Sequence, residues 1–330
     1  MHVDGRRIDL FGKRRDMDMT QGAIWQQIVL FAVPLLIGNL FQQLYNTVDS
    51  VVVGNYVGKE ALAAVGSVGP IINTLVGFFS GLATGAGVVI SQNYGAHDHE
   101  RLSVAVQTTV ALSLISCVLC TVLGVICVPF LLHFMSTPQD VFQEASSYLR
   151  IYFMGITGLL MYNIGAGILR AVGDSRRPLY FLCFSALTNL VLDLLFVIGF
   201  HWGIEGVAWA TVISQVVSAI LVFALLIRSD TPYRVKPRQM QIDGRILSQI
   251  MRIGLPGGIQ TAITSFSNVY VQGYINSFGS SVMAGWASYS KRDQFVMLPM
   301  QSISLASTTF VGQNLGAGEV KRAKKGIGAS

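Results

Sequence analysis

The chain has 330 residues, of which 52% are hydrophobic and only 12% are charged, and its formal net charge is +6. A water-soluble domain of this length rarely carries so few charges, and the mean hydropathy of +0.55 agrees. The apolar residues gather in runs longer than the roughly 18 residues that mark a membrane-spanning helix. This composition excludes a soluble protein with one large core and indicates an all-α polytopic membrane protein.

The apolar runs predict eight helices in four regions of the chain. A basic N-terminal segment, residues 1–22, is followed by a six-helix lobe in residues 23–228. A polar linker covers residues 229–244, and residues 245–330 contain the first two helices of a second lobe. The predicted helices cover residues 24–53, 61–90, 102–134, 141–172, 178–200, 206–227, 246–277 and 281–311.

Lysine and arginine are distributed unevenly between the loops. A cytoplasmic N-terminus places nearly all of those outside the predicted helices on the same side, and only Lys59 falls on the other side. Cytoplasmic loops carry the excess of positive charge in membrane proteins. The pattern therefore predicts a multi-pass protein of the cell (inner) membrane with its N-terminus and the linker in the cytoplasm.

The second predicted helix has a ridge of small residues. Gly77, Gly81 and Gly85 follow one another at four-residue steps and so share one helix face. Such a ridge lets the backbone of a neighbouring helix approach closely. We therefore expect another helix to pack against this face.

The first predicted helix places a carboxylate inside an apolar segment of membrane-spanning length. Gln42, Tyr45, Asn46 and Asp49 are spaced at i, i+3, i+4 and i+7, so they form one polar face. A charge at the centre of a bilayer costs roughly 2.5–3.5 kcal/mol even on a lenient scale, which makes an intramembrane acid a functional-site hypothesis. We expect this face to point into the bundle. Pro34 precedes the face in the same helix and is expected to bend the helix there.

The fifth and sixth predicted helices also carry polar faces. Asn189 and Asp193 share one face of the fifth helix, and Thr211 begins a polar stripe on the sixth. These faces should converge with that of Asp49. Two carboxylates close together disfavour simultaneous ionisation, which makes the pair a candidate proton carrier, whereas carboxylate, amide and hydroxyl oxygens also suit a hard cation. The ligand types do not decide between a proton and sodium.

The chain contains an internal repeat. Pro34 corresponds to Pro256, and the segment 92–96 (QNYGA) corresponds to 313–317 (QNLGA). Six helices separate the copies, so both halves have the same orientation in the membrane. Val271 stands opposite Asp49, which assigns ion coupling to the first half.

Two complete copies of the repeat would need a longer chain than this one. The sequence contains the first six-helix half and the opening pair of helices of the second, so we expect a fragment or a prematurely ended chain. We also expect that it does not transport by itself, because its inward polar faces would lack partners.

These features together resemble the multidrug and toxic compound extrusion (MATE) family, in its DinF-like branch. The resemblance implies two six-helix lobes around a central cavity that opens alternately to either side. It implies a cation-coupled antiporter that exports organic, often cationic, drugs and toxic compounds. The likeness rests on the polar first helix, the segment 61–65 (ALAAV), the repeated QN-x-GA motif and the segment 170–175 (RAVGDS).

The resemblance also implies residue roles. In the archaeal and DinF-like branches of the family, an Asp on the first helix, an Asn and Asp on the fifth and a Thr on the sixth form a cation site. Those positions are Asp49, Asn189, Asp193 and Thr211 here, with Tyr45 one turn before Asp49. Weaker candidates for substrate binding or gating are Gln42, Asn46, Asn163, Pro34, Arg292 and Asp293.

The same sequence features leave other functions open. A flippase for lipid-linked precursors has related architecture but favours a strongly basic cavity, and an inert truncated product is a separate possibility. The sequence has no metalloprotease or nucleophile-elbow motif, so an enzyme is disfavoured. We expect a monomer that contacts membrane lipid and a small organic substrate, without nucleic acid, cofactor or bound metal other than a coupling sodium.

Overall fold

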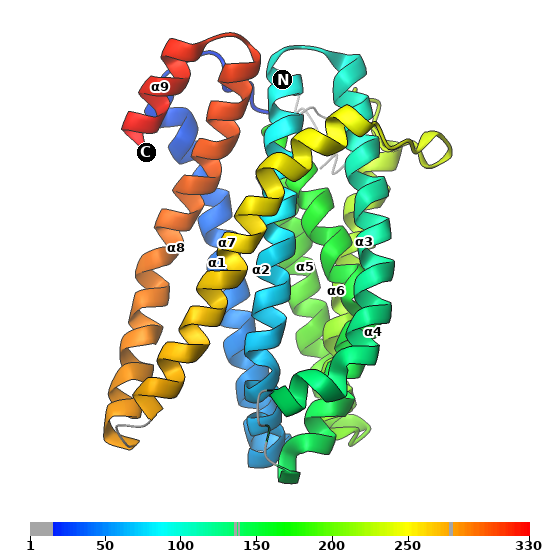
Figure 1. Cartoon of the computed structure of the whole chain (residues 1–330), viewed down its shortest axis with the longest axis vertical. Helices are drawn as coiled ribbons and strands as arrows, with labels where there is room; N and C mark the ends of the chain where they lie inside the picture. The colour runs from blue at the N-terminus through cyan, green and yellow to red at the C-terminus, as the bar shows by residue number, and fades with distance from the viewer. Residues whose placement is uncertain (1–15, 135–136, 138, 277–279) are drawn as a thin grey trace, which may run out of the picture.

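The protein folds as a bundle of long helices that run roughly along one axis (Figure 1). The structure is a computed structural model that describes residues 16–134, 137, 139–276 and 280–330, and no strand occurs in these ranges. The helices are α1 (Ile24–Val52), α2 (Lys59–Gly95), α3 (His99–Phe134), α4 (Gln139–Ala171), α5 (Arg176–Asp193), α6 (Gly203–Arg228), α7 (Gly244–Asn276), α8 (Ser280–Gly316) and α9 (Val320–Ala329).

Seven of the helices in the described part of the chain are long and apolar enough to span a membrane. All eight predicted helices are present as α1–α8, and α7, a continuous helix of 33 residues, differs from the other seven only in its weaker apolar character. Arg245 and Arg252 and several polar residues dilute its apolar character. Helix α3 shows the opposite extreme, since Ile126 and Phe130 expose about 70% of their surface (69% and 70%) on a face suited to lipid.

Helix α2 lies at the centre of the bundle, where it contacts α3, α4, α7 and α8. The predicted glycine ridge is the face that meets α7. A Cβ atom at Gly81 would collide with the backbone of Gly258, and one at Gly85 would collide with Gly254. The expectation of close helix packing at this ridge is therefore confirmed.

Helices α2 and α8 cross at their C-terminal ends, where the internal repeat brings equivalent residues together. A Cβ atom at Gly95 would collide with the Gln313 carbonyl group, and one at Gly316 would collide with the Gln92 carbonyl group. The contacts are reciprocal, as a two-fold relation between the halves requires. Only glycine permits this distance between the two backbones.

The segment that precedes α1 lies across this crossing and binds both halves. The Met19 N–H donates to Gln313 Oε1 at 3.0 Å, and Asn314 Nδ2 donates to the Met19 carbonyl at 3.0 Å. Gln313 Nε2 also donates to the Ala171 carbonyl at the end of α4, at 3.1 Å. The buried QN pair of the second repeat thus fixes the chain before α1 and the end of α4 at one point.

A second contact holds the same segment to the linker. Tyr233 donates its hydroxyl proton to the Asp16 carboxylate, with an oxygen–oxygen distance of 2.9 Å. Burial, and then the neighbouring Asp16 charge, raise the pKa of Tyr233 above its ordinary value, so the hydroxyl keeps its proton at neutral pH. The linker itself is held by Gln107 of α3, which bonds the Arg234 carbonyl and the Lys236 N–H.

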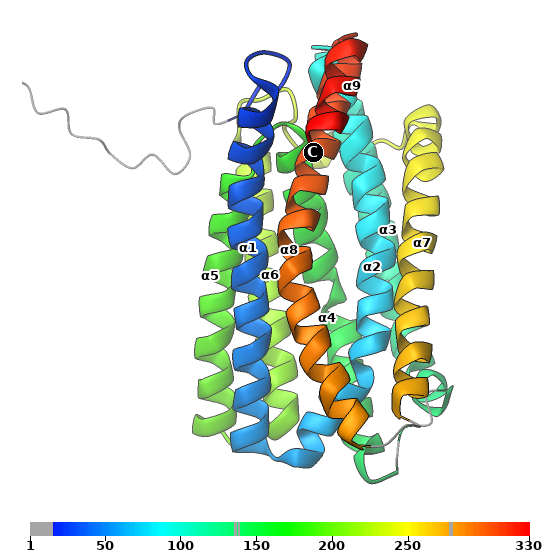
Figure 2. The ribbon, with the colours of Figure 1, turned by 90° about the vertical axis from the view of Figure 1, so that its left-hand side faces the viewer.

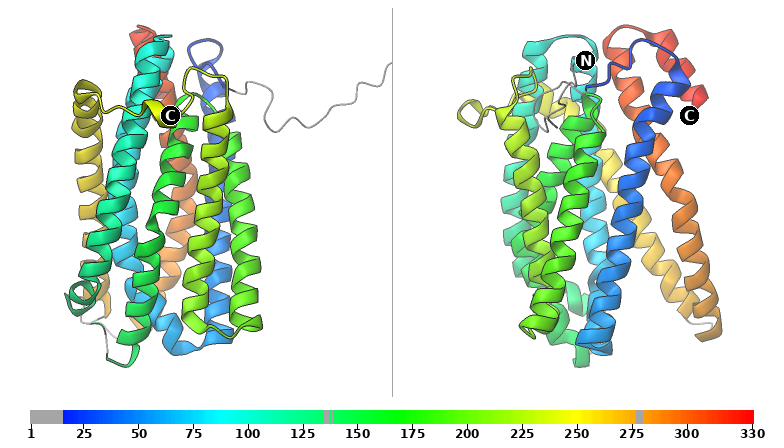
Figure 3. Two further views of the ribbon diagram at one scale, coloured as in Figure 1. Left: turned by 90° about the vertical axis from the view of Figure 1, so that its right-hand side faces the viewer. Right: turned by 180° about the vertical axis from the view of Figure 1, so that it is seen from behind.

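The two halves of the chain are close together at one end and lean apart toward the other. Figure 2 shows α1, α8 and α9 together near the start of α1, and the right-hand view in Figure 3 shows α8 diverging from α1 with distance from that end. Two side-chain hydrogen bonds connect α1 to α8 along this line, Asn39 to Ser302 at 3.2 Å and Gln43 to Gln294 at 3.1 Å.

Candidate functional site

The structure brings Asp49 of α1 and Asp193 of α5 together. Their carboxyl groups lie close enough for their charges to interact, and Asp193 is almost fully buried. Helix α1 packs against α5, with Gly38 facing Leu179 and Leu182, so the two acids meet across a helix interface. Two carboxyl groups this close disfavour simultaneous ionisation, so the pair favours a shared proton. The predicted convergence of these two acids is observed.

Three more of the predicted residues complete a connected polar cluster around this pair. Tyr45 lies beside the Thr211 side chain of α6 and close enough to both acids to interact with their charges. Asn189 Nδ2 lies 3.5 Å from Thr211 Oγ1, which is a long hydrogen bond. Helices α1, α5 and α6 each contribute to the cluster, as their polar faces predicted.

Both acids stand next to an irregular turn. Helix α1 continues after Val52 as a π-helix, Val53–Val57, and α5 continues directly after Asp193 as a second π-helix, Leu194–Gly199. The wider turns of a π-helix are uncommon and occur often at functional sites. Sequence periodicity of the ordinary helical kind does not reveal them.

Two tyrosines of α4 were not predicted to belong to this region. Tyr148 and Tyr152 are stacked, with ring centroids 6.4 Å apart, and Tyr148 is close enough to Asp49 and Asp193 to interact with their charges. Both tyrosines lie largely inside the bundle. The signal that could have found them is two hydroxyl-bearing side chains four residues apart on one face of an apolar helix.

Three oxygen atoms of the cluster are buried and lack a hydrogen-bond partner among the described residues. They are Oδ1 of Asp49, Asp193 and Asn189. A buried acceptor without a partner is costly, so such atoms mark a place for a proton or a cation. Carboxylate, amide and hydroxyl oxygens are the ligands that a hard cation prefers. Within the part of the chain that the structure describes, no group of three or more His, Cys, Asp or Glu side chains gathers as a transition-metal site would require.

The weaker candidates from the sequence do not join the cluster. Gln42 and Asn46 are exposed, on the strip of α1 between its contacts with α5 and with α8. Asn163 lies toward the other end, in the wall of a small cavity. Arg292 is exposed and Asp293 half-buried, and neither takes part in an ion pair between described side chains. The polar face of α1 is thus divided, because only Tyr45 and Asp49 point toward α5 and α6.

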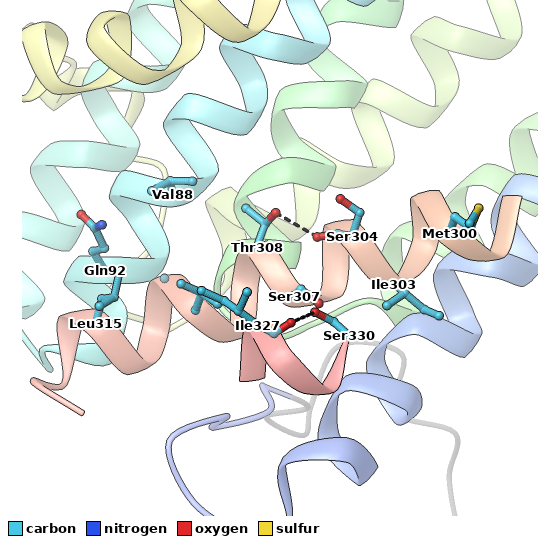
Figure 4. A pocket seen from close by; sticks show the side chains of 12 residues that line it. Val88, Gln92, Met300, Ile303, Ser304, Ser307, Thr308, Leu315, Ile327 and Ser330 are labelled. Atoms are coloured by element: carbon cyan, nitrogen blue, oxygen red, sulfur yellow. Dashed lines mark hydrogen bonds between the residues drawn. The ribbon is translucent and has the colours of Figure 1, made fainter. Parts of the chain in front are cut away.

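A larger cavity lies near the crossing of α2 and α8. It has a volume of about 560 Å³ and is lined by residues of α2, α8 and α9 (Figure 4). Thr308 and Ser330 at its wall donate their hydroxyl protons to carbonyl groups of their own helices, Ser304 and Ile327. No acid of the polar cluster lines it, so it is a separate feature.

The fold and the cluster define a multi-pass membrane protein with a pair of acids enclosed between its spanning helices. The MatE family model matches residues 34–195 and 256–330, which include both copies of the repeat. The chain therefore belongs to the MatE family of multidrug and toxic compound extrusion transporters. Members of this family are transport proteins rather than enzymes.

Curated relatives and solved structures agree with this assignment. The chain is 31% identical to the probable multidrug resistance proteins YoeA and YpnP of Bacillus subtilis (strain 168), covering 92% of its own length and 67% and 68% of theirs. It superposes on the outward-facing conformation of a multidrug resistance MATE family transporter with a TM-score of 0.89 at 26% identity. That match covers 96% of this chain and 71% of the solved one.

Proposed function

We propose that this protein is a cation-coupled secondary antiporter that exports organic, often cationic, compounds by alternating access. The observation that carries the proposal is the contact between Asp49 and Asp193 inside a bundle of membrane-spanning helices. Acids within membrane-spanning segments are costly and rare, and they mark the pathways of ions and protons. The relatives named as multidrug resistance proteins supply the class of substrate.

The proposed mechanism couples the charge of the acid pair to the position of α1. Shared protonation, or a bound sodium ion, permits the two carboxyl groups to stay close together. Loss of the cation leaves two negative charges in contact, which drives α1 away from α5 about Pro34. Because α1 also packs against α8, this movement changes the contact between the two halves. Ion binding thus biases the equilibrium between the two orientations of the central cavity.

We also propose a location and an orientation for the protein. It lies in the cell (inner) membrane as a monomer, with the N-terminus, the linker and the crossing of α2 and α8 on the cytoplasmic side. In this orientation the ends of α7 and α8 that diverge from α1–α6 face the outside of the cell. The space between the two halves therefore opens toward the outside. The partners are membrane lipid and a small organic substrate.

Ion binding is the first test, because all five residues of the cluster belong to the first six helices. The purified protein is titrated with sodium at two pH values while its thermal unfolding is followed. We expect sodium or protonation to raise the unfolding temperature, and Asp49→Asn to remove that dependence. Asp230→Asn is the matched control, since Asp230 is a fully exposed acid in the linker whose replacement changes the net charge equally.

Transport is the second test and is measured with the entire product of the gene in membrane vesicles. Efflux of a fluorescent organic cation is followed with a proton gradient and a sodium gradient imposed separately. Efflux driven by one gradient and lost in Asp49→Asn identifies the coupling ion. A folded protein that responds to neither gradient contradicts the antiporter and favours a flippase.

A further inference from the structure

Arg170 carries a positive charge into a small cavity between the halves of the chain. It lies in the last turn of α4, and its side chain lines a cavity of about 80 Å³. A Cβ atom at Gly167 would lie 3.9 Å from the Arg170 guanidinium group, so the side chain runs back along α4 beside this glycine. Residues of α2 and α8 form the other walls, which places the charge between the first and the second half.

The charge of Arg170 has no counter-ion among the described residues. The ion pairs between described side chains involve Arg101, Arg177 and Arg234. The nearest acid in sequence, Asp174, is already engaged by Arg177 at 3.4 Å and by backbone N–H groups. No hydrogen bond from the Arg170 side chain to a described residue is formed. Arg170 is half-buried, and a partly enclosed guanidinium group without a carboxylate is free to pair with an anion.

The other polar groups at the cavity wall are neutral. Thr84 and Thr308 donate their hydroxyl protons to carbonyl groups of their own helices, each at 2.9 Å, and Asn163 Nδ2 does the same at 2.9 Å. A hydroxyl that bonds only to its own helix can rotate to a ligand at small cost, because this back-bond is weak. The cavity walls therefore supply both hydrogen-bond donors and acceptors, and among the lining residues only Arg170 supplies a charge.

An oxyanion complements this arrangement. The planar guanidinium group offers five donors in a fork that matches the two oxygens of a carboxylate or phosphate. A cavity of 80 Å³ has room for such a group, given that a water molecule occupies about 30 Å³ of liquid. We propose that Arg170 is an anion-binding residue, which receives a carboxylate or phosphate group in the cavity between α2, α4 and α8.

This subsite is separate from the acid cluster. Residues 176 to 193 of α5 span the distance between the Arg170 end of the bundle and Asp193, which at 1.5 Å per residue is roughly 25 Å. The proposal goes beyond cation-coupled export, since the cavity would receive an anionic group whether or not the acids couple transport to an ion. It predicts that compounds bearing a carboxylate or phosphate bind in a way that Asp49→Asn does not alter.

Anion binding by the purified protein in neutral detergent tests the proposal. Thermal unfolding is followed while inorganic phosphate or acetate replaces chloride at constant ionic strength. We expect a saturable rise in the unfolding temperature for wild type, an apparent affinity at least tenfold weaker in Arg170→Gln, and partial retention in Arg170→Lys. Arg176→Gln is the matched control, because Arg176 is exposed six residues away and its loss changes the charge equally. Equal responses of wild type and Arg170→Gln overturn the proposal.

A second measurement on the wild type does not depend on whether Arg170→Gln folds. Phenylglyoxal modifies accessible arginines, and mass spectrometry reports the rate at each position. We expect phosphate to slow modification of Arg170 and to leave that of Arg176 unchanged, whereas equal effects at both positions contradict a specific site. Repeating the reaction in nanodiscs of phosphatidylcholine, with and without phosphatidylglycerol, identifies the source. Protection by the anionic lipid alone assigns the group to a headgroup, and protection only by added phosphate assigns it to a soluble solute.

Discussion

The interface between the two halves of the chain differs strongly between its two ends. At the crossing of α2 and α8, backbones touch at Gly95 and Gly316, and the buried pair Gln313 and Asn314 makes three hydrogen bonds to two separate segments. Toward the other end, α1 and α8 share one bond between exposed side chains, Gln43 to Gln294. A rigid contact at one end and a sparse one at the other is the arrangement that a pivot requires.

Replacement of Gly95 should have the largest effect, because it acts on the rigid end. The new Cβ atom in Gly95→Ala meets the Gln313 carbonyl, and relief requires movement of a backbone. We expect a loss of about 3 kcal/mol in the free energy of unfolding, the upper end for overpacking. Denaturant unfolding of the purified protein in detergent measures it.

The control for this substitution lies on the same helix. A Cβ atom at Gly66 meets nothing within 4 Å, so Gly66→Ala should gain roughly 0.5–1 kcal/mol from helix propensity. The two changes are chemically identical and opposite in expected sign. Equal effects would show that the crossing is looser than its backbone contacts indicate.

Asn314→Ala should have an intermediate effect. It removes the bond to the Met19 carbonyl and leaves a buried acceptor without that partner, at a cost of about 1–3 kcal/mol. Amide hydrogen exchange should quicken in residues 16–21. Among the described residues, the side chain of its repeat counterpart Asn93 bonds the Val89 carbonyl in its own helix and no other group, so Asn93→Ala is expected to leave exchange in that segment unchanged. Equal exchange in both variants would mean that Asn314 does not hold the segment.

Gln43→Ala should have the smallest effect, because it acts on the sparse end. Both Gln43 and Gln294 are in contact with solvent, and loss of an exposed bond changes the free energy of unfolding by less than about 0.5 kcal/mol. The same denaturant titration measures it. A loss above 1 kcal/mol in the free energy of unfolding would show that this end of the interface is also strongly bonded, and the contrast between the two ends would disappear.

Much of the fold follows from local pattern. Apolar runs predicted the eight long helices, with most ends within five residues, and the spacing of Gly77, Gly81 and Gly85 predicted the packed face of α2. Helical periodicity also placed Asn189 and Asp193 on one face. Each of these features depends on residues within a few turns of one another, which is the range over which sequence spacing is informative.

The features that the sequence did not reveal depend on how distant segments meet. The polar face of α1 contained Gln42 and Asn46 together with Asp49, and only the positions of α5 and α8 decide which of them become enclosed. Tyr148 reaches the acids because α4 packs beside them, and no spacing connects the two segments. The attachment of Met19 likewise rests on a partner almost 300 residues away. The roles of the acid pair remain predictions that the ion-binding and transport experiments address.

The attachment of the chain before α1 has an energetic consequence for any change of orientation. Met19 accepts or donates bonds to Gln313, Asn314 and Arg322, all in the second half, while Met17 bonds Gly173 in the first. Separation of the halves at this end must break one set or the other. At roughly 1 kcal/mol for each bond, loss of the three Met19 bonds changes the population ratio between closed and open states by about a hundredfold, and loss of the single Met17 bond changes it by about fivefold. The short segment before α1 belongs to no spanning helix, and it therefore stabilises the state in which the two halves are closed at this end.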